Sequence, residues 1–347
     1  MPAGEPLRGR GAGNRPAAPA TAYSDSAAAA KGPWLAGRAS GDGKPDKAEG
    51  RQAPGLPGIR RPKGAGQVQD HFCPWLLLLQ IRRAQRLPGA APRTGHLPVL
   101  SFDRPGYCES DAHPARTEES IAVDIAELAD NLQLEPKFHL MGFSMGGEIM
   151  WSCLKHIPHR LAGVAILAPV GNYWWSGLPP DVYQEAWYVQ FPQDRAAVWV
   201  AHHLPWLANW WNTQRLFPSS SVKARNPAIY SKEDKPLTAK FAQRAHNKQV
   251  TQQGEHESLH RDMIVGFGKW GWSPLQPGNA FAGVGDDVKV HLWHGVEDLF
   301  VPVALSRYIS KRLPWVIYHE LPTAGHLFPV ADGMPDVIVK SLLLGDG

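Results

Sequence analysis

The sequence predicts an α/β protein with a mostly parallel sheet, helices on both faces and an inserted helical segment. Short apolar stretches alternate with amphipathic helical patterns from about residue 98 to the C-terminus. This rhythm breaks over about residues 172–275, which hold nine of the 14 tryptophans. The residues best suited to chemistry each come just after a predicted strand, where parallel sheets carry their ligand sites.

The apolar stretches define the expected sheet. Predicted strands span residues 98–102, 138–141, 161–167, 288–293 and 315–321. A buried strand with unusual flanks is the simplest interpretation of Leu76 to Leu79. Between strands, Thr117 is a predicted N-cap, with Glu118 and Glu119 favourable in the first helical turn.

Two amphipathic helices follow from apolar residues at helical spacing. The first has an apolar face made of Ile121, Ile125, Leu128 and Leu132. The second spans residues 334–344 and closes the chain. We expect its inward face to contain Val337, Ile338 and Leu342.

A G-x-S-x-G motif runs from Gly142 to Gly146, between an apolar strand and a helical pattern. This is the context in which the motif forms a nucleophile elbow. Ser144 would sit on a sharp, strained turn, where bulky residues two positions before or after it would clash. The turn would also aim the amide of Met145 at a developing oxyanion. The alternative is a glycine-rich β–α turn without a catalytic role.

Two further residues complete a possible triad. Asp298 and His326 each follow a predicted strand, so the chain order is Ser, Asp, His. In this hypothesis Ser144 attacks, His326 takes its proton, and Asp298 orients the imidazole and stabilises its charge. The alternatives are that Asp298 is a turn residue, that Glu297 is the acid, or that His326 is structural.

With these motifs in place, the chain from about Leu100 onward resembles the α/β-hydrolase superfamily, in the form of plant AB hydrolase-1 type proteins of unassigned substrate. The resemblance implies a serine hydrolase that acts on an ester or related acyl substrate, through an acyl-enzyme on Ser144 and without cofactor or metal. Cys108 stands where the family usually has glycine. The matching stretches are residues 101–107, 142–147, 256–268 and 324–329.

The tryptophan-rich segment, about residues 172–275, lies where the resembled fold carries a lid. A lid would pack over the nucleophile and form an apolar pocket for a small apolar or amphipathic acyl substrate. The alternative for most of the tryptophans is that they form the core of the segment itself. An aromatic platform for nucleic acid is not expected, because basic residues are not interleaved with the rings.

The N-terminal part of the chain does not fit this pattern. Residues 1–68 are rich in Gly, Pro, Ala and Arg, which predicts a disordered extension. Few acids in the first forty residues are weakly typical of an organelle transit peptide, although an unstructured extension is the preferred interpretation. Residues 69–98 should contain a strand that ends in a His-Gly loop, which supplies the second oxyanion donor. No His-Gly is present there.

A shift of the translation frame would account for this absence. Read one nucleotide later, the codons permitted for residues 69–81 allow Lys-Ile-Ile-Phe-Val-His-Gly-Phe-Ser-Ser-Ser-Lys-Tyr, an apolar strand that enters a His-Gly loop. Our hypothesis is that residues from about 50 to 98 are translated out of frame. The alternative is a divergent N-terminus that evolved normally. In either case the hydrolase domain proper is predicted to span residues 99–347.

Charge and composition argue against nucleic-acid binding, against disulfide or metal sites made by the cysteines, and against a membrane span. A net charge of +4, scattered along the chain, argues against nucleic-acid binding. Cys73, Cys108 and Cys153 lack metal or disulfide spacing, which favours a reducing compartment such as the cytoplasm. No apolar run reaches the ~18–20 residues of a membrane span. Oligomeric state and substrate are not indicated.

Three functions therefore stay open. The leading hypothesis is a serine esterase. The second is a ligand-binding receptor on the same fold, with slow hydrolysis or none. The third is an inactive, truncated hydrolase, because loss of one oxyanion donor alone costs on the order of 10²–10³ in rate.

Overall fold

A computed structural model describes residues 76–79, 99–108, 110–244, 251–276, 281–285 and 287–344. All of them belong to the compact unit Pro54–Gly347. The disorder predicted for residues 1–68 lies outside the described residues. So does most of the segment 69–98, including the place expected for a His-Gly loop.

Six strands form one sheet in the order β2-β1-β3-β4-β5-β6. The last four are mutually parallel, and β1 runs antiparallel to both of its neighbours. The mostly parallel sheet predicted from the sequence is therefore confirmed. The strands are β1 (Leu76–Leu79), β2 (Val99–Ser101), β3 (Phe138–Phe143), β4 (Leu161–Leu167), β5 (Lys289–Gly295) and β6 (Val316–Leu321).

The direction of β1 has a consequence for the site. Leu76 pairs with Gly142 and Leu79 pairs with His139. The chain therefore enters β1 beside the carboxyl end of β3 and leaves it beside the amino end. β1 therefore ends beside His139, away from Ser144, whereas a strand parallel to β3 would end beside it.

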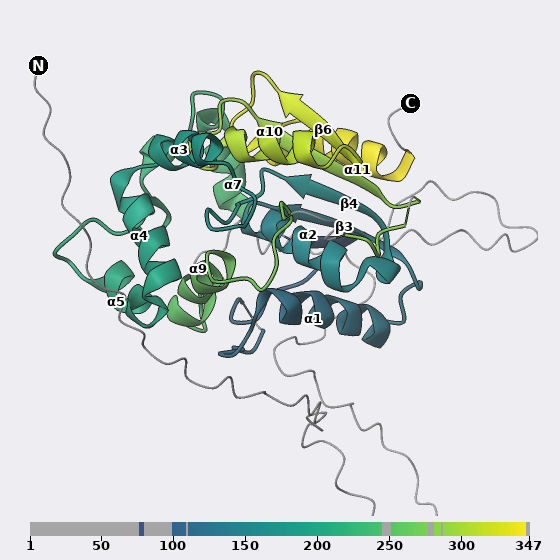
Figure 1. The fold of residues 1–347 in the computed structure, drawn as a ribbon, viewed down its shortest axis with the longest axis horizontal. Coiled ribbons are helices and arrows are strands. Elements are labelled where there is room, and N and C mark those ends of the chain that lie inside the picture. Colours follow the sequence, from purple (N-terminus) through teal and green to yellow (C-terminus); the bar gives the residue numbers. More distant parts are fainter. Residues whose placement is uncertain are drawn as a thin grey trace, which may run out of the picture. The chain divides into compact units, whose positions relative to one another are not determined.

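Helices cover both faces of the sheet (Figure 1). Thr117 caps α1 as predicted: its hydroxyl accepts from the amide of Ser120, and the Ser120 hydroxyl accepts from the Thr117 amide. In the last helix Ile338 and Leu342 are buried, but Val337 is 46% exposed, so its predicted inward position is wrong. Adjacent residues of a helix point about 100° apart, so Val337 does not share the face formed by Ile338 and Leu342, which are four residues apart. These helices are α1 (Glu118–Asn131), α2 (Met145–His156), α10 (Val303–Arg312) and α11 (Met334–Leu344).

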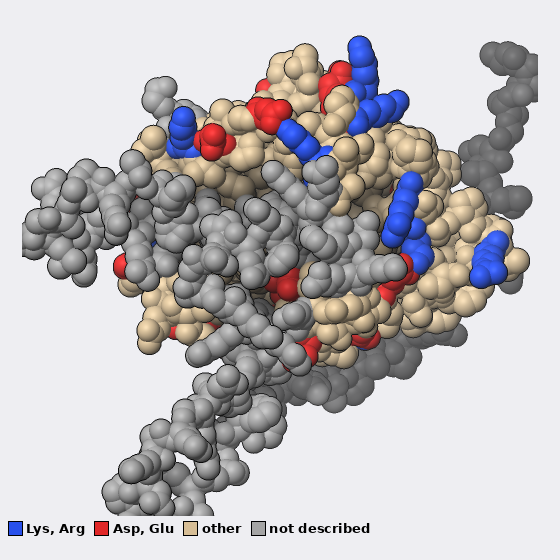
Figure 2. Space-filling view, turned by 180° about the vertical axis from the view of Figure 1, so that it is seen from behind, with Lys and Arg blue, Asp and Glu red and all other residues tan. Residues whose placement is uncertain are grey.

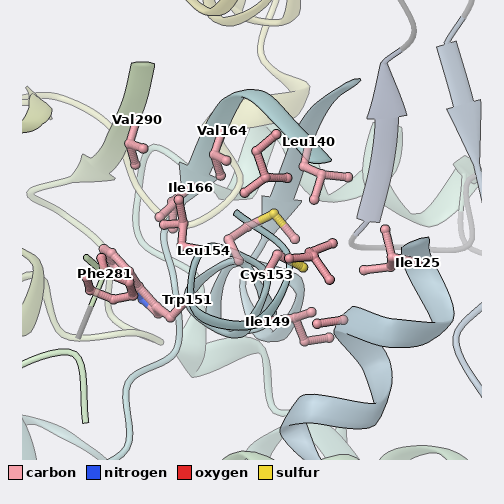
Figure 3. Packing of buried hydrophobic residues seen from close by; sticks show 14 of the residues in the cluster. Ile125, Leu140, Ile149, Trp151, Cys153, Leu154, Val164, Ile166, Phe281 and Val290 are labelled. Carbon is pink, nitrogen blue, oxygen red and sulfur yellow. The ribbon is translucent and has the colours of Figure 1, made fainter. Parts of the chain in front are cut away.

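The described core has three clusters: one on each face of the sheet, and a third that joins the helical insertion to α10. Alternate residues of the strands enter alternate clusters: Leu140 and Ile166 belong to the first, Phe143 and Leu167 to the second. This is the period-two alternation of a strand that is covered on both sides. In the first cluster, side chains of α2 lie between β4 and α1, and Trp151 lies beside Phe281 (Figure 3).

Between β4 and β5 the chain forms a helical insertion, residues 172–275, where the sequence predicted a break in the strand–helix rhythm. Trp175, Trp187 and Trp272 are buried in it, whereas Trp199, Trp206 and Trp210 are exposed. Its helices are α3 (Pro180–Val189), α4 (Pro192–His203), α5 (Ala208–Thr213), α6 (Ser221–Ala224), α7 (Thr238–Arg244), the π-helical turn η5 (His256–His260) and α9 (Arg261–Gly266). Short 3₁₀ turns are η1 (Pro158–Arg160), η2 (Pro205–Leu207), η3 (Pro227–Ile229), η4 (Lys235–Leu237) and η6 (Phe328–Val330).

Charged side chains on the visible face in Figure 2 are dispersed, and basic and acidic groups lie near one another. Lys137 with Asp287 and Arg307 with Glu320 are two such ion pairs. Within the described part of the chain, no helix has the length and apolar content needed to cross a membrane.

Cys108 has a φ of +46°, in the left-handed region that favours glycine. This explains in physical terms why the resembled family has glycine there. We expect Cys108→Gly to raise the free energy of unfolding by up to about 1 kcal/mol, because relief of the strained backbone outweighs the added freedom of the unfolded chain. Cys108→Ala, which removes the thiol but keeps Cβ, should give no such gain. Urea unfolding of both variants checks this, and an equal gain from Ala would show that the thiol was the cause.

Candidate active site

Ser144 is placed by a strained turn between β3 and α2. Its backbone has φ +56° and ψ −119°. The turn is held on both sides, because the Ser144 amide donates to Leu167 and the Ser144 carbonyl accepts from Val170. A Cβ on Gly142 would lie 2.2 Å from the carbonyl oxygen of Gly146, so the motif permits backbone contact that a side chain would block.

The three residues predicted as a triad lie in contact. Ser144 Oγ is 3.2 Å from Nε2 of His326, and Nδ1 of His326 is 2.7 Å from Oδ2 of Asp298. With Nδ1 protonated, His326 donates to Asp298 and its Nε2 is left to accept the serine proton. Glu297, the alternative acid, is exposed, and it is Asp298 that contacts the histidine.

Asp298 is fully buried and has four hydrogen-bond donors. Oδ1 accepts from the amides of Phe300 and Val301, both at 2.8 Å. Oδ2 accepts from His326 and also faces Nε2 of His294 at 3.3 Å. Burial acts to raise the pKa of Asp298, but the charge of His326 and the hydrogen bonds from His294 and His326 outweigh it and hold the pKa well below its usual value. The carboxylate is therefore ionised at every pH at which the protein would work.

His294 is a member of the site that the sequence analysis named no role for. Its Nε2 faces two acceptors, the Val301 carbonyl oxygen at 3.0 Å and Asp298, so this nitrogen carries the proton. Its Nδ1 then accepts from the hydroxyl of Ser306 at 2.8 Å. Asp298 follows His294 by four positions, and that short spacing at the end of β5 is the signal that could have identified His294.

Asp234, also missed, anchors the loop that carries His326. Its carboxylate accepts from the backbone amides of His326 at 3.0 Å and Leu327 at 2.6 Å. It is fully buried and lies in the helical insertion, 92 residues before His326. No local pattern links residues so far apart in the chain. The His326 ring itself packs against Phe143 and Phe300.

Met145 is the first residue of α2 and lines the same cavity as Ser144. The first amides of a helix have no partner within the helix and carry partial positive charge. The Met145 amide therefore stays a predicted oxyanion donor. The loop predicted to supply a second donor lies outside the described residues.

A cavity of about 150 Å³ adjoins Ser144. Most of its wall is apolar, and the polar residues Arg104, Tyr107, Gln190 and Asp194 also line it. Its wall combines residues of the turn at Ser144, of the loops after β2, β4 and β5, and of the helical insertion. Apolar members of the wall are Val170, Val198, Leu259, Met263, Phe267 and Phe300.

A buried ionic cluster supports the cavity from one side. Asp262 accepts from Arg104 and Arg116, each at 2.6 Å, and from the hydroxyl of Tyr107 at 2.5 Å. The ion pair with Asp262 holds Arg104, which lies in the loop after β2. The cluster joins the loop after β2 to α9 of the helical insertion.

Glu148, on α2 one turn after Ser144, lies beside this cluster. Burial first, and then the negative charge of Asp262, raise the pKa of Glu148 well above its usual value. A Cβ on Gly266 would lie 2.4 Å from Oε2 of Glu148, so the two elements are in close contact there. Among the residues that the structure describes, no three His, Cys, Asp or Glu side chains are grouped so as to hold a metal.

The fold and this geometry define the class of protein, and sequence comparison agrees. The sequence profile of the family described as alpha/beta hydrolase fold matches residues 83–330, and the chain belongs to this family. Of the strands described above, β1 lies before the matched region. Comparison with curated proteins gave no match.

Solved structures with similar folds include esterases. The chain is similar to a thermophilic esterase from Thermogutta terrifontis, with 17% identity and a TM-score of 0.43 over 70% of this chain and 76% of the other. It is also similar to the esterase RhEst1 from Rhodococcus sp. ECU1013, with 15% identity and a TM-score of 0.46 over 71% and 79% of the two chains. These likenesses carry no argument about the substrate.

The contact between Gly142 and Gly146 gives a direct test of the elbow. Gly142→Ala would force the two backbone segments apart, so we expect a loss of about 1–3 kcal/mol in the free energy of unfolding. Gly271→Ala is the matched control, because nothing lies within 4 Å of a Cβ built there. That control should change stability by less than about 0.5 kcal/mol. Chemical denaturation measures both, and equal effects would mean that the elbow is less tightly packed than described.

His260 gives the protein a pH-dependent stability. Burial first, then the charges of His256 and Lys223, lower the pKa of His260 to about 4. Between pH 6.5 and 4 the unfolded chain binds a proton that the folded chain does not, so the free energy of unfolding falls as the pH falls through this range. We expect His260→Gln to flatten this decline, and the exposed His159→Gln not to. Melting curves from pH 7 to 4 provide the test; parallel curves for all three proteins would contradict it.

Proposed function

We propose that the protein is a serine hydrolase of the carboxylesterase type, with Ser144 as nucleophile, His326 as general base and Asp298 as its orienting acid. The observation that carries this proposal is the bridging position of His326, 3.2 Å from the Ser144 hydroxyl and 2.7 Å from the Asp298 carboxylate. A base within reach of a nucleophile, itself held by a third group, is the arrangement that activates serine. The strained turn adds support, because backbone strain of this kind is typical of active sites.

The reaction follows from these positions. As Ser144 Oγ attacks the ester carbonyl, its proton passes to His326 Nε2, and the oxyanion forms near the Met145 amide. His326 then gives the proton to the departing alcohol, which leaves an acyl group on Ser144. Water, deprotonated by His326, attacks the acyl carbonyl and releases the acid. Asp298 stays ionised throughout and stabilises the imidazolium at both stages.

The cavity supports a small apolar or amphipathic acyl substrate. Its apolar wall would accept the acyl chain, and burial of that chain would stabilise binding by about 25 cal/mol per Å² of apolar surface. Chain length is limited by a volume of about 150 Å³. In this proposal the helical insertion acts as the lid, because α4, α6 and α9 contribute Val198, Val222 and Met263 to the wall.

Ser144→Ala tests the assignment. We expect hydrolysis of p-nitrophenyl butyrate to fall at least about 10³-fold, because the nucleophile is lost. The fold should be retained, since Ala keeps the Cβ that this backbone already accommodates. Ser310→Ala, on α10 and outside the cavity wall, is the matched control and should keep full activity. Retained turnover in Ser144→Ala would overturn the mechanism.

A second candidate function is a ligand-binding protein that hydrolyses slowly or not at all. The direction of β1 favours it, since the chain that follows β1 leaves at the edge of the sheet opposite to Ser144. With Met145 as the main oxyanion donor, the rate would be lower by on the order of 10²–10³ than with two donors. Saturable binding of a short ester without turnover, in protein that melts cooperatively, would support this function over the esterase.

We further propose that residues from about 50 to 98 are translated out of frame, and that the natural chain carries a strand and His-Gly loop in their place. The reversed β1 supports this for the part of the segment before residue 83, whereas residues 83–98 lie inside the region matched by the family. Sequencing the transcript across codons 45–105 decides it. An uninterrupted frame that encodes His-Gly is the expected result; a transcript that encodes residues 69–98 as printed would contradict it and favour loss of hydrolase activity.

A further inference from the structure

The helical insertion exposes four large apolar side chains in a stretch of twelve residues. Trp206 is 77% exposed, Trp210 48%, Leu216 78% and Phe217 54%. We call these four residues the aromatic surface. Soluble proteins rarely expose large apolar groups together unless the surface binds something. Neither the triad nor the cavity uses these residues, because none of the four lines the cavity.

The side chains of the aromatic surface are connected. Trp206 lies in η2 and Trp210 in α5, four positions apart, a spacing that places side chains on one side of a helix. The rings of Trp210 and Trp211 lie 6.5 Å apart, and Trp211 stacks on Phe217 at 5.6 Å with an angle of 12°. A chain of ring contacts therefore joins α5 to the turn that carries Leu216 and Phe217.

Hydrogen bonds of the Gln214 side chain fix the turn that carries Leu216 and Phe217. The side-chain carbonyl of Gln214 accepts from the amides of Leu216 and Phe217. The side-chain amide of Gln214 donates to the carbonyl oxygens of Trp211 and Phe217, at 3.1 and 2.9 Å. One side chain thus makes four bonds across the turn. A turn fixed in this way holds Leu216 and Phe217 outward, where an unsupported loop would let them fold back.

The chain segment that carries this surface is basic. Residues 195–232 contain no Asp or Glu, yet they contain five basic residues: Arg195, Arg215, Lys223, Arg225 and Lys232. The whole chain of 347 residues has a net charge of only +4. Lys223 pairs with Glu255 of the neighbouring segment. Arg215 and Arg225 are exposed, and Arg215 is adjacent to Leu216.

Exposed aromatic and aliphatic side chains beside exposed arginines match an anionic lipid surface better than the surface of another protein. Tryptophan and phenylalanine favour the boundary between headgroups and acyl chains, and neighbouring arginines bind lipid phosphates. Each basic residue near an anionic membrane contributes attraction that falls off within a Debye length. The same segment contributes Val198 and Val222 to the wall of the cavity, and Val222 is itself 40% exposed.

We propose that the aromatic surface docks the protein on an anionic lipid bilayer. Trp206, Trp210, Leu216 and Phe217 enter the headgroup region, and Arg215 and Arg225 bind the headgroups. Docking brings the segment that forms part of the cavity wall to the lipid. The proposal does not depend on the catalytic assignment.

Sedimentation of the full chain with vesicles tests the docking. We expect the protein to partition onto vesicles of phosphatidylcholine with phosphatidylserine, more weakly onto phosphatidylcholine alone, and less at high salt. Tryptophan emission should shift to the blue on binding. Ser144→Ala should partition like the unmodified protein, which separates this proposal from the proposed function. Equal weak partition onto both vesicles, or none, would overturn the proposal.

Two sets of variants locate the surface. Leu216→Gln with Phe217→Gln should lower the partition coefficient about tenfold or more, whereas Val337→Gln, at a comparably exposed aliphatic residue on α11, should not. Arg215→Glu with Arg225→Glu should remove the preference for phosphatidylserine, and Arg312→Glu, on α10, should keep it. Unchanged partition in both surface variants would overturn the proposal.

Light scattering of the same proteins addresses the competing occupant, a second copy of this chain. A monomer whose size is unaffected by Leu216→Gln supports lipid docking. A dimer that this substitution dissociates, combined with unchanged vesicle binding, would overturn docking and assign the surface to self-association. Melting curves of all variants check that these exposed substitutions leave the fold intact.

Discussion

The backbone of Ser144 is the constraint on which the rest of the site depends. Its φ of +56° is tolerated because Gly142 and Gly146 touch, and because bonds to Leu167 and Val170 hold the turn from the neighbouring strand. Such a conformation costs of order 1–3 kcal/mol, and favourable packing of the surrounding core must offset this cost. Burial of β3 and β4 on both faces does so, which links the chemistry directly to the packing of the sheet.

Two buried carboxylates from the helical insertion hold the two loops that flank the nucleophile. Asp234 binds the backbone around His326, and Asp262 binds Arg104 and Tyr107. Both are nearly inaccessible to solvent, so each bond is made where the effective dielectric is low and an unpaired charge would be costly. The insertion is therefore part of the site's framework as well as its cover, and a change at either carboxylate would be felt at the cavity.

The strand β1 occupies the place between β2 and β3 but runs against both. Four leucines can satisfy the hydrogen bonds of a neighbouring strand in either direction, because backbone pairing is available to parallel and antiparallel strands alike. Direction, however, decides which end of the strand lies beside Ser144. The sheet is thus continuous across this point, while β1 ends away from Ser144.

Local patterns in the sequence were sufficient for the strands β2 to β6, the Thr117 cap, the helices α1, α2 and α11, and the order of Ser144, Asp298 and His326. Each rests on periodicity or turn chemistry within a few residues. Val337 shows the limit, because it is adjacent to the buried Ile338 and neighbouring residues of a helix point about 100° apart, so both cannot face the core. Asp234, Asp262 and the direction of β1 depend on contacts between residues far apart in the chain, and only the tertiary structure decided them, since no local propensity encodes which distant partner satisfies a buried charge or a strand edge.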